Sequence, residues 1–150
     1  MLIRMFEKPS TDSIAHDEHL LRLPLAGLLP AQHTLVVDPV MHTAGLLFQP
    51  TEGEARIIVQ RHFSPNGMCV LLPLLQAYPH YCPYEMLLAS LYPQSLDDAR
   101  RQLRENWDLA IRPVRRAIGS IIAGLRAFGL TVRSIRGTGY LLEALAPRSA

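Results

Sequence analysis

The stretch between residues 113 and 128 limits the fold of this chain most narrowly, because it predicts one long amphipathic helix. Its apolar residues recur at steps of four, three, four and three, which places them in a single stripe. Pro113 suits the first helical turn, and Gly129 suits the position just after the last. The opposite face is left to solvent or to a partner. The residues of the stripe are Val114, Ile118, Ile121, Leu125 and Phe128.

A β-hairpin is predicted directly after this helix. Residues 131–136 and 140–145 are β-type runs, and Gly137-Thr138-Gly139 separates them. Glycines at this spacing permit the positive φ angles of a tight hairpin turn.

Strands and then helices are predicted before the long helix. Serine caps helices well and proline fits their first position, which marks where the helices begin. Three strands, at 34–40, 45–49 and 55–62, form an antiparallel sheet. Three helices follow, from Ser64-Pro65 to Tyr78-Pro79 with a bend or early stop at Pro73, from Pro83 to Tyr92-Pro93, and, capped by Ser95, from Leu96 to about Trp107. The predicted class is α+β.

The predicted domain covers residues 32–145. Residues 1–31 show no firm period, so we expect a partly ordered arm there, and residues 146–150 should form a loose tail. The richest apolar stretch, Leu20–Leu29, is interrupted by Pro24 and is far shorter than the ~20 residues that cross a bilayer. No membrane segment is therefore predicted.

The chain has no residue pattern of an enzyme or a metal site. We find no nucleophile with a base, no phosphate-binding glycine loop and no set of metal ligands. Cys69 and Cys82 lack zinc-type spacing and indicate reduced, largely buried thiols in the cytoplasm. We expect no catalytic residue, no metal and no cofactor.

Charge is distributed unevenly along the chain. Residues 1–99 carry five basic and ten acidic residues, whereas residues 100–136 carry nine arginines and two acidic residues. Such a block of arginine in an otherwise acidic chain is typical of a surface that binds phosphate groups. A solvated helix face is the other interpretation, and composition alone does not decide between the two.

The second half of the chain resembles a known family. Residues 132–140, Val-Arg-Ser-Ile-Arg-Gly-Thr-Gly-Tyr, are similar to the wing signature of OmpR/PhoB-type winged-helix DNA-binding domains. The segment from Arg112 to Leu125 matches the spacing of that family's recognition helix. Phe63-Ser64-Pro65 and the segment from Glu85 to Tyr92 resemble its first and second helices. The resemblance covers about three quarters of the chain.

This resemblance implies a winged helix-turn-helix, with an N-terminal antiparallel sheet, a helical core and a C-terminal hairpin as the wing. It implies a cytoplasmic, DNA-binding transcription regulator. Its recognition helix, 113–128, would enter the major groove, and its wing, 131–142, would lie at the minor groove. Double-stranded DNA is the expected partner. RNA polymerase, through segment 93–111, and a second copy in a homodimer are further expectations.

The resemblance and the side-chain chemistry together indicate the DNA contacts. Arginines bind phosphates and base edges, and small residues let the helix backbone approach closely. Three of the arginines would lie in the first turn of the helix. Arg136 matches the wing arginine that reaches toward the minor groove, and Arg133 would contact a phosphate. The expected contacts are Arg112, Arg115, Arg116, Gly119, Ser120, Ala123, Arg126, Arg133, Arg136 and Thr138.

The sequence departs from the family in three ways. The 31 residues before the predicted domain cannot hold the family's receiver domain. Segment 93–111 is longer and more helical than usual. Positions that are often basic in the recognition helix are here Gly119, Ser120, Ile122 and Ala123. The alternative function is therefore a winged-helix protein-interaction module, an adaptor or anti-regulator with weak or no base-specific DNA binding.

Overall fold

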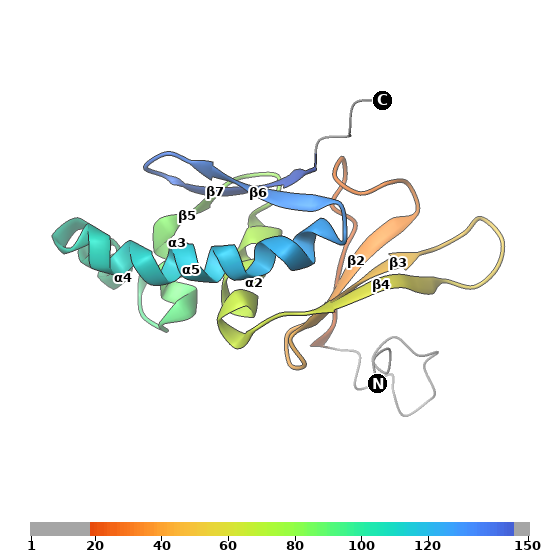
Figure 1. Ribbon diagram of the computed structural model, residues 1–150, viewed down its shortest axis with the longest axis horizontal. Coiled ribbons are helices and arrows are strands. Elements are labelled where there is room, and N and C mark those ends of the chain that lie inside the picture. The colour runs from red at the N-terminus through yellow and green to blue at the C-terminus, as the bar shows by residue number, and fades with distance from the viewer. Residues whose placement is uncertain (1–18, 146–150) are drawn as a thin grey trace. The chain divides into compact units, whose positions relative to one another are not determined.

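The computed structural model describes residues 19–145, which fall into two compact units that divide between Phe63 and Ser64 (Figure 1). Most of the predicted arm, residues 1–18, and the predicted tail, residues 146–150, lie outside the described residues. The first unit holds a four-stranded antiparallel sheet, and the second holds helices with a C-terminal hairpin. The α+β class, the N-terminal antiparallel sheet and the hairpin are thereby confirmed. No helix within 19–145 is both long and apolar enough to cross a membrane.

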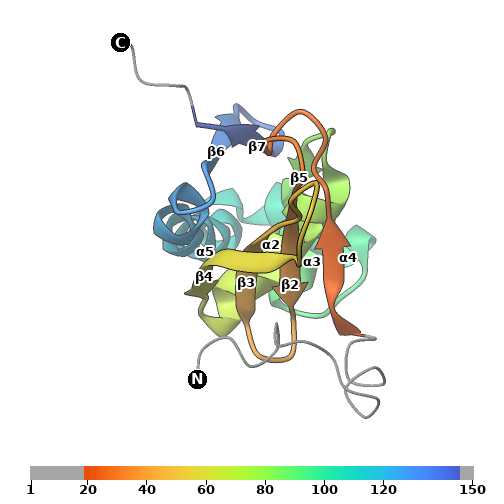
Figure 2. The same cartoon turned by 90° about the vertical axis from the view of Figure 1, so that its right-hand side faces the viewer.

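The first unit has one strand more than the three predicted. Figure 2 shows the sheet, whose order is β1-β2-β3-β4. The added strand, β1, pairs Leu21 with Val37 and Leu23 with Leu35. It was missed because three residues with Arg22 in the middle show no detectable period. The strands are β1 (Leu21–Leu23), β2 (His33–Asp38), β3 (Thr43–Phe48) and β4 (Arg56–His62).

A β-bulge explains why β4 alternates only loosely between apolar and polar residues. Leu46 pairs with Val59 and Leu47 pairs with Ile57, so Ile58 is left without a partner across the ladder. An extra residue of this kind bends a strand and breaks its inward and outward alternation. Ile58 is accordingly exposed although it is apolar.

The second unit contains four helices and a small sheet among its described residues. The sheet has the order β5-β7-β6, so a two-residue strand joins the predicted hairpin. Each of the two predicted serine caps is present, with Ser64 Oγ accepting from Gly67 N at 2.9 Å and Ser95 Oγ from Asp98 N at 3.0 Å. The elements are α2 (Pro65–Ala77), β5 (Cys82–Pro83), α3 (Tyr84–Leu91), α4 (Leu96–Glu105), α5 (Trp107–Arg126), β6 (Leu130–Ile135) and β7 (Gly139–Ala144).

Proline marked the start of α2 and the ends of α2 and α3 as predicted, but Pro73 and Pro113 are not helix boundaries. Helix α2 continues through the buried Pro73 to Ala77, so the early stop does not occur. Helix α5 begins at Trp107, six residues before the predicted start at Pro113. Pro113 cannot donate the usual hydrogen bond to the carbonyl of Leu109. Leu109 is 60% exposed, so water can satisfy that carbonyl and the helix continues.

The core of the second unit lies between α2, α3, α5 and the hairpin, which contact one another. Helix α5 contributes Ile111 to the buried stripe, one turn earlier than predicted, and this burial favours the early start. Helices α2 and α5 approach closely at Gly67, where an added Cβ would lie 3.0 Å from Ile121 Cγ2. Fully burying a side chain such as Ile121 stabilises the fold by roughly 1.5–3 kcal/mol.

Candidate nucleic-acid interface

Helix α5 presents one exposed face along most of its length, opposite its buried stripe. The stripe is buried as predicted, with Val114, Ile121 and Leu125 fully inaccessible. Only apolar side chains of α5 are therefore buried in the core, and the polar side chains of the helix face solvent. This outer face comprises Arg112, Arg115, Arg116, Gly119, Ala123 and Arg126, all of which are exposed.

The arginines of the outer face lie farther from the helix start than predicted. Because α5 begins at Trp107, Arg112 lies in its second turn and Arg116 in its third, not in the first. The unpaired N–H groups of a helix are confined to its first turn. Any anion bound at this face therefore meets the side chains alone and not the helix N-terminus.

Two of the three arginines of the neighbouring helix α4, Arg100 and Arg101, are paired with carboxylates, whereas Arg104 is exposed and forms no ion pair within residues 19–145. Arg100 Nε lies 3.2 Å from Glu85 Oε2, and its Nη1 lies 3.2 Å from Asp97 Oδ1. Arg101 pairs with Asp98, one turn earlier in the same helix. These pairs form the solvated, self-neutralised helix face that was the alternative interpretation of the arginine block.

The outer face of α5 differs, because none of its arginines forms an ion pair with a carboxylate among the described residues. Four exposed arginines at the outer face and the hairpin turn form no ion pair with a carboxylate within residues 19–145. These four are Arg112, Arg116, Arg126 and Arg136. Exposed guanidinium groups in this state are available to phosphate oxygens.

Arg133, which was expected to contact a phosphate, is held by the hairpin itself. Its Nε donates to Glu143 Oε2 at 2.7 Å, across the two strands. The carboxylate compensates the guanidinium charge, so a phosphate would have to compete with Glu143. We therefore leave Arg133 out of the set of available cations.

Arg115 lies beside Tyr140, at the start of the second hairpin strand. Burial raises the pKa of the Tyr140 hydroxyl and Tyr84 raises it further, whereas the Arg115 guanidinium lowers it. The ring of Tyr84 packs edge-on against Tyr140, at 5.7 Å between centroids, and against Trp107, at 5.2 Å. This cluster links the starts of α3 and α5 to β7, and Arg115 is the outer arginine that interacts with its Tyr140.

The middle of α5 has no free polar group with which to read a base. Gly119 and Ala123 have no side-chain donor or acceptor, and Ile122 is half-buried. Ser120 was expected to contact DNA, but its Oγ donates to the carbonyl of Ala117 at 2.6 Å. An added Cβ on Gly119 would meet no described atom within 4 Å, so the backbone there is open to close approach.

The hairpin turn carries a single exposed cation. Gly137 has a φ of +70°, which is the backbone conformation that the predicted glycine turn requires. Thr138 is half-buried and fully engaged within the protein: its N–H donates to the Ile135 carbonyl at 3.0 Å and its Oγ1 to the Arg136 carbonyl at 3.3 Å. The hydroxyl of Thr138 is thus not free, and Arg136 is the side chain that this turn offers.

The position of the turn is fixed by a glycine that was not singled out from the sequence for this role. A Cβ added to Gly139 would lie 2.1 Å from the Cys82 carbonyl oxygen and 2.9 Å from Pro83 Cα. The backbone of β7 therefore approaches that of β5 as closely as only glycine permits. Cys82 itself is fully buried, and that burial, with a smaller effect from Glu85, raises the pKa of its thiol to about 12.

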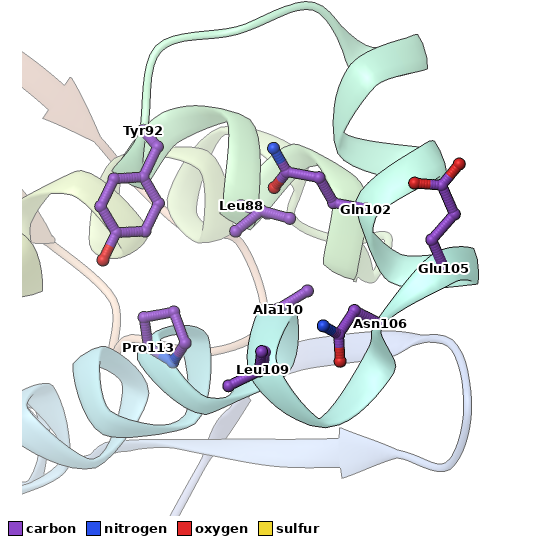
Figure 3. Close-up of a pocket in the computed structure, with 8 residues that line it drawn as sticks. All are labelled: Leu88, Tyr92, Gln102, Glu105, Asn106, Leu109, Ala110 and Pro113. Atoms are coloured by element: carbon purple, nitrogen blue, oxygen red, sulfur yellow. The ribbon is translucent and has the colours of Figure 1, made fainter.

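A second concave surface lies between α3, α4 and the start of α5. Figure 3 shows this groove, which has a volume of about 360 Å³. Apolar side chains face it, among them Tyr92, which is 54% exposed, and Leu109, which is 60% exposed. Its lining consists of Leu88, Tyr92, Gln102, Glu105, Asn106, Leu109, Ala110 and Pro113.

Within the described part of the chain, no three histidine, cysteine or carboxylate side chains lie together in a way that could hold a metal ion. Comparison with known proteins gives no match, whether to a family model, to a curated protein or to a solved structure. The OmpR/PhoB-type resemblance of the sequence therefore stays a prediction.

Proposed function

We propose that this chain is a DNA-binding transcription regulator of the winged-helix type. Helix α5 lies in the major groove and the turn of the β6–β7 hairpin lies at the minor groove. The observation that carries the proposal is a set of four exposed arginines without an ion pair within residues 19–145, beside a helix in which Arg100 and Arg101 are paired; the four are Arg112, Arg116, Arg126 and Arg136. Folding that leaves these four cations unpaired favours an anionic partner.

The dimensions of α5 suit a DNA groove. Arg112 and Arg126 lie 14 positions apart on this helix, about 21 Å at the usual rise per residue. A major groove about 12 Å wide admits one α-helix, provided that the inward face carries no bulky apolar group. Gly119 and Ala123 meet that condition at the middle of the outer face. The arginines on either side of them are then within reach of the phosphates.

The salt dependence of duplex binding tests this proposal. Each neutralised phosphate releases counterions and contributes about −0.9 to the slope of log K against log salt. Four available arginines therefore predict a slope between about −3 and −4 for a mixed-sequence duplex, measured by fluorescence anisotropy. Binding that is absent at low salt, or that does not change with salt, would contradict the proposal.

The groove beside α4 favours a second candidate, the winged-helix protein-interaction module. It exposes Tyr92 and Leu109 next to Gln102 and Asn106, a mixture that is common at protein interfaces. RNA polymerase is the partner that the resemblance suggests for this part of the chain. Leu109→Asp should leave the fold and the salt slope unchanged because Leu109 is exposed. If Leu109→Asp removes activity in a transcription assay while R112A/R116A does not, the second candidate replaces the first.

A further inference from the structure

Reading a base pair in the major groove requires side-chain donors or acceptors at the middle of the inserted helix. On the outer face of α5, that middle is formed by Gly119 and Ala123. The one hydroxyl nearby, that of Ser120, donates to the Ala117 carbonyl at 2.6 Å and lies on the side of the helix that faces α2, where a Cβ added to Gly67 would be 3.0 Å from it. The structure thus removes base-reading groups where a recognition helix would need them.

The charged side chains of the outer face lie at its two ends. Arg112 and Arg116 are at one end and Arg126 is at the other, about 15 Å from Arg116 along the axis. Cations that flank an uncharged middle are placed for the phosphates on the two sides of a groove. Contacts of this kind position a protein on DNA but carry no sequence information of their own.

The hairpin turn combines a long cation with a narrow backbone. Arg136 is exposed, Gly137 has no side chain, and the Thr138 hydroxyl is bonded back to the Arg136 carbonyl. Figure 1 shows the hairpin running beside α5, with its turn toward the start of that helix. One guanidinium on a slender turn fits a narrow minor groove, which A·T-rich sequence provides and whose negative potential attracts arginine.

We infer that DNA sequence preference in this protein resides in the hairpin turn and not in the helix. Arg136 selects A·T-rich duplex through the minor groove, while α5 supplies affinity through phosphates with little discrimination among base pairs. The inference rests on the proposed function, and it names the substrate as duplex DNA with a narrow A·T minor groove. The guanine 2-amino group projects into the minor groove and would obstruct the guanidinium.

Duplexes that contain inosine separate the two grooves. Inosine paired with cytosine presents the major-groove O6 and N7 of guanine but lacks the 2-amino group in the minor groove. Three duplexes of equal length would carry a central A·T, I·C or G·C segment and compete for the protein at one salt concentration. We expect the A·T and I·C duplexes to bind within about twofold of each other, and the G·C duplex roughly tenfold more weakly, about 1.4 kcal/mol.

Two variants assign that preference to a residue. Arg136→Ala should bring the A·T and G·C affinities together while keeping most of the salt dependence. Arg126→Ala, the matched control on α5, should weaken binding to all three duplexes by the same factor. Both side chains are exposed, so near-UV circular dichroism should show an unchanged fold in each variant.

The outcomes are distinct. If the I·C duplex binds like the G·C duplex, bases are read in the major groove and the inference is wrong. Equal binding of all three duplexes, or an A·T preference that survives in Arg136→Ala, also overturns it. If no duplex binds at any salt concentration, the proposed function fails and the inference fails with it.

Discussion

Helices α4 and α5 both carry several arginines, yet the structure treats the two sets differently. On α4, Arg100 and Arg101 are compensated by carboxylates of α3 and of α4 itself, and only Arg104, next to the end of the helix, is left without an ion pair within residues 19–145. On α5, Arg112 and Arg116 are exposed and form no ion pair within residues 19–145. The arginine-rich segment of the sequence thus contains both arginines that are neutralised by carboxylates and arginines that are free to bind an anion. Ion pairing separates Arg100 and Arg101 from Arg112 and Arg116, which arginine content alone does not do.

The largest effect on stability and on duplex binding is expected from a substitution that displaces the hairpin. Gly139→Ala places a Cβ 2.1 Å from the Cys82 carbonyl oxygen, so β7 must move away from β5. We expect a loss of about 3 kcal/mol in the free energy of unfolding, measured by urea denaturation. Duplex binding should weaken as well, because Arg136 loses its position.

The control for that substitution is Gly119→Ala, since an added Cβ there meets no described atom within 4 Å. Alanine is favoured over glycine inside a helix, so this variant should be more stable by up to about 1 kcal/mol. A Gly139→Ala protein that is as stable as the wild type would contradict the close approach of β5 and β7.

The comparison is tested directly by removing equal charge from each helix. The double variant R112A/R116A should make the salt slope of duplex binding shallower by up to about two units, one for each lost phosphate contact. The matched double variant R100A/R101A removes the same charge from α4 and should change the slope by much less than one unit. Equal changes in the two slopes would mean that ion pairing does not decide which arginines bind.

The hairpin offers a way to move one arginine from the paired class to the available one. Glu143→Gln removes the carboxylate that lies 2.7 Å from Arg133 Nε and keeps the shape of the side chain. The freed guanidinium should steepen the salt slope by up to about one unit. Stability should change by less than about 1 kcal/mol because the pair is exposed. An unchanged slope would place Arg133 away from the DNA.

A smaller effect concerns Arg115, which is neither paired with a carboxylate nor fully separate from the protein. Because Arg115 lowers the pKa of Tyr140, Arg115→Ala should raise that pKa further. The hydroxyl is favoured in its neutral form by folding, so its contribution to stability is complete below pH 10 and is lost as the pH rises through the folded pKa.

NMR titration of the Tyr140 ring should therefore show a higher pKa in the variant than in the wild type. Arg116→Ala, a neighbouring outer arginine that has no effect on the Tyr140 pKa in this structure, is the control. If the pKa of Tyr140 falls in Arg115→Ala, the assigned contact is wrong.

Features with local physical causes were predicted well from the sequence. Both serine caps form, because a hydroxyl and a nearby N–H suffice for them. The glycine turn at Gly137 and the buried stripe of α5 also follow from short-range rules. The longer β-strands were predicted to within a few residues, although their exact first and last residues were not predicted correctly.

Features that depend on distant partners were missed. Strand β5 has two residues and exists because Cys82 pairs with Tyr140, 58 positions later in the chain. Trp107 was assigned to the end of one helix but begins another, where its ring contacts Tyr84. Neither pairing leaves a periodic signal in its own segment. The groove beside α4 was missed for the same reason, since three helices form it together.

The candidate site divides in the same way. The outer face follows from helical spacing and its residues could be named in advance. Which of the expected contact residues are available could not be predicted. Arg133 pairs with Glu143 on the other hairpin strand, and the hydroxyl of Ser120 bonds to the helix backbone. Arginine-bearing motifs therefore predict where a surface lies better than which of its groups act.

The most direct test of the account is to map the bound surface by NMR. The protein would be labelled with ¹⁵N and titrated with an A·T-rich duplex, following backbone amides and arginine Nε–Hε groups. We expect the largest shifts at Arg112, Arg116, Gly119, Arg126 and Arg136, with Arg101 and Leu109 little changed. Shifts that gather along the groove and α4, while the outer face of α5 is unaffected, would contradict the account.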